Sequence, residues 1–343
     1  MKSLCILGRQ PALGLAELES LYSAAAVTPC GDSAALVDVP APDLDFNRLG
    51  GSIKYGQVLE ILDATDYRKI ESALLKQLPA VAATLDGKVQ LGLSVYGVRS
   101  TIQQLLATGL TLKKALRKQG RSVRLVPNKE LALNSASIQH NNLTGASGIE
   151  ILIVQDGQRS IIARTLASQD IDSYTMRDRG RPKRDARVGM LPPKLAQIII
   201  NLATSATAPG NDFTILDPFC GTGVVLQEGW LMGYDVLGTD LEQRMADYTI
   251  TNMEWTTDKF PRSGFWGADK GDATNTDWDM RRTYAIACET YLGKPFTSLP
   301  PPDIMAQTIS ECNLIIKKFL RNIGTQVPIG TRLCLAVPAW QVR

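Results

Sequence analysis

The spacing of apolar residues in the first part of the chain predicts short strands and helices. Residues 4–8 form an apolar run that predicts a strand, and a helix is expected to begin at Pro11, because the leucines after it recur at near-helical intervals. A second strand is expected over residues 34–39, where prolines follow. These elements predict a small α+β domain over residues 1–63.

A second α+β pattern covers residues 64–166. The spacing predicts helices at 67–78 and 101–119 and strands at 88–95, 123–126, 149–154 and 160–165. The last two strands are expected to form a hairpin, because Asp156-Gly157 stands between two alternating runs. The helix at 101–119 is basic, which makes this predicted domain a plausible platform for RNA.

The pattern changes again in the second half of the chain. Residues 167–193 are polar and basic with little apolar periodicity, which predicts a linker. From residue 194 onward helices and strands alternate, with strands expected at 213–216, 234–239, 284–288 and 332–337. This alternation predicts an α/β, Rossmann-like domain with a parallel doubly wound sheet over 194–343.

Composition narrows the chemistry. The chain has one histidine, His140, and six scattered cysteines without a Cys-x-x-Cys pair, so we expect no metal site. No apolar run approaches the roughly 20 residues of a membrane span. The chain also starts without a signal-peptide pattern, and we expect a cytoplasmic protein. Its chemistry must then use carboxylates, backbone groups or a bound cofactor.

Basic residues gather in two clusters, although the net charge is only +3. The first comprises Lys113, Lys114, Arg117, Lys118, Arg121 and Arg124, and the second Arg177, Arg179, Arg181, Lys183, Arg184, Arg187 and Lys194. A single run of this kind is usually a solvated face. Two runs flanking a domain junction favour contact with the phosphates of a nucleic acid.

A glycine-rich turn after the strand at 213–216 predicts a cofactor site. The turn consists of Asp217, Pro218, Phe219, Cys220, Gly221, Thr222 and Gly223. In such sheets the ligand lies beyond the carboxyl ends of the strands, where glycines let the backbone approach it. Asp240, followed by Leu241, ends the next strand and suits two ribose hydroxyls, and Asp272-Ala273 stands where an adenine amino group would lie.

Two other interpretations of the turn are open. A nicotinamide or flavin site would use the same ribose-binding acid, but it needs Gly-x-Gly-x-x-Gly around a pyrophosphate. Asp217 would repel a pyrophosphate, whereas it suits the amino group and sulfonium of S-adenosylmethionine. Alternatively, Asp217 could merely cap a strand-turn-helix corner. With Asp240 and Asp272 in register, the turn favours S-adenosylmethionine.

The same residues resemble a known family. The turn 217–223, the stretches 177–182 and 189–197, and the opening 7–11 and 15–19 are similar to THUMP-domain tRNA guanine-N2-methyltransferases, which act on guanosine 10 of tRNA. The resemblance implies an N-terminal ferredoxin-like domain over 1–63, a THUMP domain over 64–166 that grips the tRNA acceptor end, and a class I methyltransferase domain. Some members work with a small activating protein subunit.

The expected catalytic position departs from the usual pattern. Enzymes that methylate exocyclic amines usually carry Asp/Asn-Pro-Pro-Tyr after the fourth strand, but this chain has Glu289-Thr290-Tyr291-Leu292 there. By position, Glu289 would hold the guanine N2 amine and accept its proton, and Tyr291 would stack on the extruded base. The alternative is a strand-end glutamate in a protein whose catalysis has been lost.

Several functions therefore stay open at this point. The main hypothesis is N2-methylation of a tRNA guanosine. The alternatives are methylation of ribosomal RNA or of another nucleobase amine, and a noncatalytic RNA-binding protein that keeps the fold. The family's sheets usually contain a further antiparallel pair of strands, so we also expect either a short sheet or a C-terminally incomplete domain.

Overall fold

The computed structural model describes residues 2–185, 190–206, 213–278, 283–296, 298 and 300–340. The chain divides into two compact units, Met1–Ile171 and Asp172–Arg343, and each unit has apolar cores of its own.

One sheet forms the frame of the first unit. Its eight strands in the described residues are β1 (Ser3–Leu7), β2 (Val27–Cys30), β3 (Ala34–Val37), β4 (Ser52–Leu62), β5 (Val89–Tyr96), β6 (Val123–Leu125), β7 (Gly148–Asp156) and β8 (Arg159–Ser168), in the order β2-β3-β1-β4-β8-β7-β5-β6. Strand β4 pairs antiparallel with both β1 and β8. The expected domain boundary near residue 63 therefore lies at the end of a strand that belongs to one continuous sheet.

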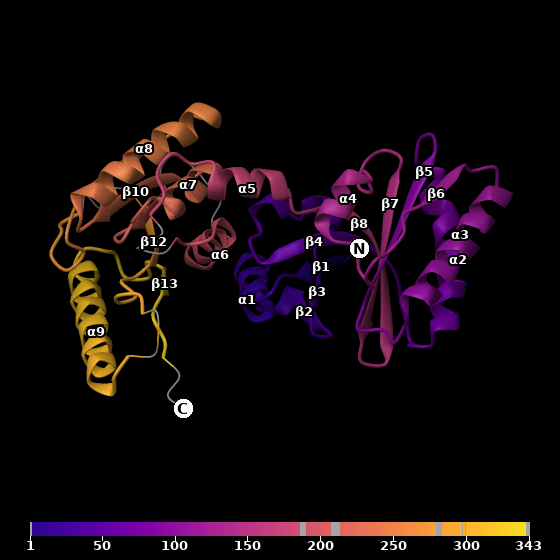
Figure 1. Ribbon diagram of the computed structural model, residues 1–343, viewed down its shortest axis with the longest axis horizontal. Coiled ribbons are helices and arrows are strands. Elements are labelled where there is room, and N and C mark those ends of the chain that lie inside the picture. Colours follow the sequence, from indigo (N-terminus) through magenta and orange to yellow (C-terminus); the bar gives the residue numbers. More distant parts are fainter. Residues whose placement is uncertain are drawn as a thin grey trace. The chain divides into compact units, whose positions relative to one another are not determined.

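Helices of the first unit pack on different parts of this sheet. They are α1 (Pro11–Tyr22), α2 (Tyr67–Ala83), α3 (Ile102–Lys118) and α4 (Ser135–His140), with 3-10 turns at Ala24–Ala26, Ala41–Asp43 and Phe46–Arg48. Helices α2 and α3 lie side by side and cover β5 and β7 with a shared apolar core (Figure 1). Helix α3 begins where a capping box at Thr101 and Gln104 satisfies its first amide groups.

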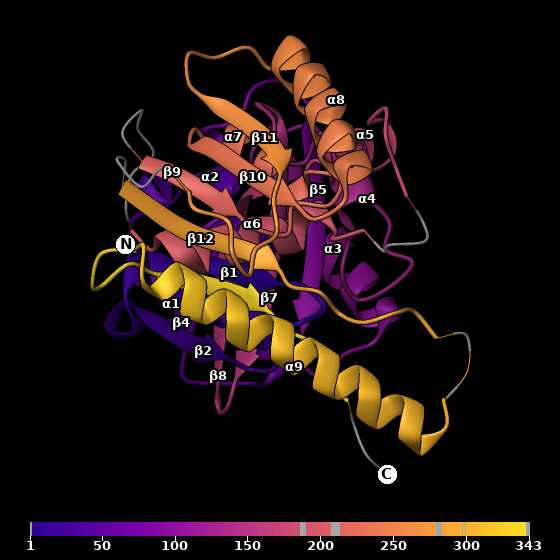
Figure 2. The ribbon, with the colours of Figure 1, turned by 90° about the vertical axis from the view of Figure 1, so that its left-hand side faces the viewer.

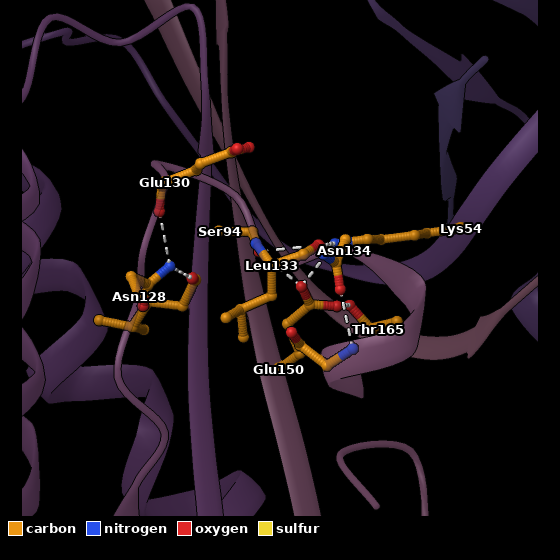
Figure 3. A network of polar contacts seen from close by, with 10 residues as sticks. Lys54, Ser94, Asn128, Glu130, Leu133, Asn134, Glu150 and Thr165 are labelled. Atoms are coloured by element: carbon orange, nitrogen blue, oxygen red, sulfur yellow. Dashed lines mark hydrogen bonds and ion pairs between the residues drawn. The ribbon is translucent and has the colours of Figure 1, made fainter. Parts of the chain in front are cut away.

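A buried ion pair joins four strands of this sheet (Figure 3). Lys54 Nζ on β4 lies 2.7 Å from Glu150 Oε1 on β7, and these side chains are 1% and 0% exposed. Ser94 on β5 and Thr165 on β8 donate to the Glu150 carboxylate at 2.5 and 2.6 Å, while Lys54 also donates to the carbonyl of Leu133. Both charged groups of the pair thus have several partners, as burial of charge requires.

The second unit contains a parallel sheet, as the sequence predicts. In the part that the structure describes, its strands are β9 (Phe213–Asp217), β10 (Asp235–Asp240), β11 (Trp266–Lys270), β12 (Thr283–Glu289) and β13 (Leu333–Ala336), in the order β11-β10-β9-β12-β13 (Figure 2). All neighbouring strands pair parallel. The chain order reverses between β10 and β12 around the central β9, which is where such folds bind ligands.

Helices cover both faces of the parallel sheet. They are α6 (Pro193–Thr204), α7 (Val224–Leu231), α8 (Gln243–Lys259) and α9 (Pro302–Gly324); the helix before them in the chain, α5 (Ile171–Arg179), has no buried residue. Alternate strand residues point to opposite sides, so Ile215 packs with α6, α7 and α8, while Leu216 packs with Phe319 of α9. The α/β, Rossmann-like architecture expected from the sequence is confirmed.

Several elements were not predicted from the sequence. Strands β2, β4 and β11 and helix α4 were missed, and α5 forms within residues 167–193, where a linker was expected. Helix α5 has no buried residue, so it lacks the apolar periodicity by which a helix is recognised. Among the described residues, no helix is both long and apolar enough to cross a membrane.

Replacing Lys54 by methionine should destabilise the first unit by about 3–5 kcal/mol, because Glu150 would stay buried without its cation. The double variant Lys54→Met/Glu150→Gln should lose less. All five tryptophans lie beyond residue 171, so their fluorescence reports on the second unit and circular dichroism reports on both. We expect the urea unfolding of the first unit, followed by circular dichroism, to move to lower urea concentration, while the unfolding transition followed by tryptophan fluorescence stays unchanged. Equal losses of stability in the single and double variants would contradict the charge argument.

Candidate cofactor and active site

The glycine-rich turn connects β9 to α7. Asp217, the last residue of β9, is 2% exposed, and its Oδ1 accepts a hydrogen bond of 3.0 Å from the amide of Phe219. Gly221 and Gly223 have φ angles of +54° and +83°, a backbone conformation that residues with a Cβ atom rarely adopt. A Cβ at Gly223 would also lie 2.9 Å from the Thr249 methyl group, whereas the space beside Gly221 is open.

Asp240 links the turn to the end of the second strand. Its Oδ2 accepts a hydrogen bond of 3.0 Å from the amide of Gly221, and its Oδ1 one of 2.9 Å from the amide of Glu242. A carboxylate has about four acceptor positions, so both oxygens keep capacity for further donors. The two bonds fix the position of the Asp240 carboxylate at the end of β10.

The other residues expected to hold the cofactor differ in their surroundings. Asp272 is half-buried, and its Oδ1 accepts hydrogen bonds of 2.8 Å from both the amide and the hydroxyl of Thr274. Ala273 is 4% exposed, and its carbonyl accepts from the Asn322 amide. Leu241 is 64% exposed, so an apolar side chain stands in solvent directly after Asp240.

Acidic side chains gather at this edge of the sheet. Burial raises the pKa of Asp217 well above its ordinary value, and the nearby charges of Asp240 and Glu289 raise it further. Burial also raises the pKa values of Asp240 and Glu289. No three of the described acidic, cysteine or histidine side chains come together as metal ligands would. A cationic organic ligand fits these acids, and the ammonium and sulfonium of S-adenosylmethionine are of that kind.

Glu289 ends β12, beside the turn. The sheet register pairs Leu216 with Ile286, so Asp217 and Glu289 both lie just beyond the paired residues at one edge. Tyr291 is half-buried; burial raises its pKa, and Cys312 and Glu311 of α9 add to that rise. The structure thus brings Glu289 to the turn, while the groups that act on Tyr291 belong to α9.

Thr249 and Asn252 of α8, which were not predicted as site residues, hold two carbonyl groups of the turn. Thr249 Oγ1 donates to the carbonyl of Gly221 at 2.9 Å, and Asn252 Nδ2 donates to the carbonyl of Thr222 at 2.8 Å. Both side chains are 0% exposed. They share a helix face with Met245 and Met253, so the helical spacing of polar residues on an apolar face is the signal that could have revealed them.

The first basic cluster is divided between surface and interior. Lys114, Arg117 and Lys118 are exposed on α3 and Lys113 is half-buried. The Arg121 guanidinium instead donates to the carbonyls of Leu85 and Gly87. Arg121 therefore binds the loop that follows α2, whereas Lys114, Arg117, Lys118 and Arg124 present their charge to solvent.

The second basic cluster is divided in the same way. Arg179, Lys183 and Arg184 are exposed, whereas Arg181 is 3% exposed and donates to Gln227 at 3.5 Å. Arg177 Nε donates to the buried Glu228 at 2.8 Å. Contact of Arg177 and Arg181 with RNA phosphates, expected from the sequence, does not fit these positions, because both guanidinium groups bind side chains of α7. Arg187 lies outside the described residues.

Burial raises the pKa of Glu228 to about 7 from its ordinary 4.5, although Arg177 lowers it. Because the pKa of Glu228 is higher in the folded state than in the unfolded state, protonation of this side chain favours folding. That contribution to stability is fully present below pH 4.5 and is lost as the pH rises through about 7. Across this window the unfolding free energy should fall by about 3 kcal/mol more than in Glu228→Gln. Urea unfolding followed by tryptophan fluorescence measures this difference; parallel pH profiles of the two proteins would contradict it.

Comparisons with known proteins find relatives of part of this chain. Residues 181–275 match the family model UPF0020, described as an RMKL-like methyltransferase domain. A tRNA (guanine(10)-N2)-dimethyltransferase of Methanothermobacter thermautotrophicus is 32% identical over 153 residues, or 44% of this chain and 39% of the relative. The enzyme of the same name from Methanocaldococcus jannaschii is 36% identical over 93 residues, or 27% and 25%. The aligned part thus spans about two fifths and one quarter of these relatives.

A solved structure has a similar overall fold. The crystal structure of TrmN from Thermus thermophilus is 17% identical, with a TM-score of 0.50 over 98% of this chain and 88% of that one. This similarity supports the fold alone. With the matched family model and the sheet order described above, residues 181–275 are similar to the UPF0020 methyltransferase domain, and the second unit has the Rossmann-like fold of class I methyltransferases.

Proposed function

We propose that this protein transfers a methyl group from S-adenosylmethionine to the exocyclic N2 amine of a guanosine in tRNA, with guanosine 10 as the target. The observation that carries the proposal is the cluster of Asp217, Asp240 and Glu289 around the glycine turn, where burial and mutual repulsion raise the pKa of Asp217. The names of the curated relatives support the choice of RNA and base.

The turn and its neighbours would hold the cofactor through complementary charge and hydrogen bonding. Asp217 would face the cationic amino acid part, Asp240 the ribose hydroxyls, and the amide groups at the start of α7 the carboxylate, because no side chain caps that helix. Leu241 offers an apolar surface for the adenine ring, and Asp272 Oδ2 is a further acceptor. The bound cofactor would supply an activated methyl group.

Glu289 would orient the guanine amine and accept its proton. The amine's lone pair is delocalised into the base, so orientation and stabilisation of developing positive charge are the main catalytic tasks. The raised pKa of Glu289, caused by burial, makes its carboxylate a better proton acceptor than an exposed glutamate. Tyr291, two residues further, would contact the extruded base.

Basic residues that are exposed or half-buried would bind the RNA backbone. In the first unit these are Lys113, Lys114, Arg117 and Lys118 of α3, and in the second they are Arg179, Lys183 and Arg184. Phosphate contacts of this type fix position without reading sequence. In this proposal, residues 64–166 act as a THUMP domain on the tRNA acceptor end and the protein works in the cytoplasm. A small activating subunit is the further partner that the family resemblance suggests.

Incubation with labelled S-adenosylmethionine and unmodified tRNA should yield N2-methylguanosine on nucleoside analysis. Replacing Glu289 by glutamine should lower kcat about 100-fold, because proton acceptance by a positioned group is lost. Glu254→Gln removes an exposed acid of α8 and serves as the matched control, with activity unchanged. The same assay shows whether one or two methyl groups are added.

Two outcomes would contradict the proposal. Methyladenosine, or labelling of ribosomal RNA instead of tRNA, would show a different substrate. A folded protein that binds S-adenosylhomocysteine and tRNA but transfers no methyl group, with or without an added activating subunit, would be a noncatalytic RNA-binding protein.

Neutralising the exposed charges of α3 should weaken tRNA binding in a salt-dependent way. The triple variant Lys114→Ala/Arg117→Ala/Lys118→Ala should lower the slope of log affinity against log salt by about one for each phosphate that it no longer neutralises. The control Arg68→Ala/Lys69→Ala/Lys76→Ala removes the same charge from exposed positions on the adjacent α2. Equal slopes for the two triple variants, measured by filter binding, would contradict a specific role of α3.

A further inference from the structure

Asn252 makes an unusually complete set of hydrogen bonds for a side chain in the middle of a helix. Its Nδ2 donates to the carbonyls of Thr222 and Lys183 at 2.8 and 3.0 Å, and its Oδ1 accepts from the amide of Lys183 at 2.9 Å. The side chain is 0% exposed. One amide group therefore joins the glycine turn to a segment that lies 69 residues before Asn252 in the sequence.

That earlier segment, residues 181–185, is called the strap here. Contacts on either side of Lys183 hold it: the buried Arg181 donates to Gln227 of α7, and the buried Asp185 pairs with the exposed Arg244 of α8 at 2.7 Å. The side chains of Lys183 and Arg184 are exposed. Lys183 is thus held by its backbone while its side chain reaches solvent, and Nζ lies 5.5 Å from the centre of the Tyr248 ring.

The bond to Thr222 fixes a peptide plane of the turn. Thr222 stands between two glycines with positive φ angles, which leave the backbone on both sides easy to rotate. The preceding carbonyl, of Gly221, is held by Thr249, and the amide of Gly223 by the carbonyl of Cys220 at 2.7 Å. Among the described residues no group accepts from the amide of Thr222, which lies between the peptide plane that Thr249 holds and the plane that Asn252 holds.

We propose that Asn252 is a positioning residue that holds the glycine turn in its cofactor-binding conformation and locks the strap to it. A preorganised donor binds a ligand without the cost of ordering it first. The strap would then place the charges of Lys183 and Arg184 at a fixed position relative to the turn. This inference rests on the proposed methyltransferase function and adds a residue that does not itself touch cofactor or RNA.

Titration calorimetry of the full chain with S-adenosylhomocysteine tests the inference directly. Asn252→Ala should weaken binding about tenfold, since one buried hydrogen bond of the turn is lost. Asn252→Asp should bind as weakly, because a carboxylate accepts from Lys183 but donates to neither carbonyl. In the control Thr256→Val, the changed residue lies one turn further on the same buried face. Its hydroxyl accepts from Gln227 and donates to the backbone carbonyl of Asn252 but makes no bond to the turn, so the affinity should be unchanged even if the stability falls.

Kinetics separate positioning from general destabilisation. With tRNA saturating, Asn252→Ala should raise the KM for S-adenosylmethionine about tenfold and leave kcat within about twofold, because saturating cofactor restores the turn. Equal affinities of wild type and Asn252→Ala, or an equal loss in Thr256→Val, would overturn the inference while the proposed function stands. A wild-type protein without affinity for S-adenosylhomocysteine would overturn both.

Discussion

Parallel pairing of β9 with β10 and β12 is the constraint on which the candidate site depends. Because the three strands run in the same direction, their last residues meet at one edge, and Asp217, Asp240 and Glu289 each end a strand there. No local feature of the chain brings these acids together. Their mutual repulsion and burial oppose ionisation, so the fold keeps at this edge a set of groups that a cationic ligand would stabilise.

Polar groups behind the turn give this edge its shape. Thr249 and Asn252 lie on the buried face of α8 with Met245 and Met253, and each holds a carbonyl of the turn. A buried amide or hydroxyl without partners would destabilise the helix packing. The backbone groups that each of these side chains satisfies account for its presence there, and they belong to the glycine turn, which is the proposed cofactor site.

Basic residues that look alike in the sequence have different physical roles. Lys114, Arg117 and Lys118 present their charge to solvent, while Arg121 binds backbone carbonyls and Arg177 pairs with Glu228. In the first unit Lys54 is an extreme case, because it is buried and matched by Glu150, Ser94 and the carbonyl of Leu133. A count of charges along the chain therefore overstates the surface available to a nucleic acid.

The sequence by itself determined the alternation of strands and helices in the second unit, the place of the glycine turn and the candidate acids. These follow from local periodicity and from glycines, which mark backbone conformations that other residues rarely adopt. It did not predict β4, whose inward position 54 is a lysine and so breaks the apolar alternation. It did not separate Arg121, Arg177 and Arg181 from the exposed cations or single out Asn252. Those roles depend on partners 30 to 69 residues away, which only the tertiary structure brings within hydrogen-bonding distance.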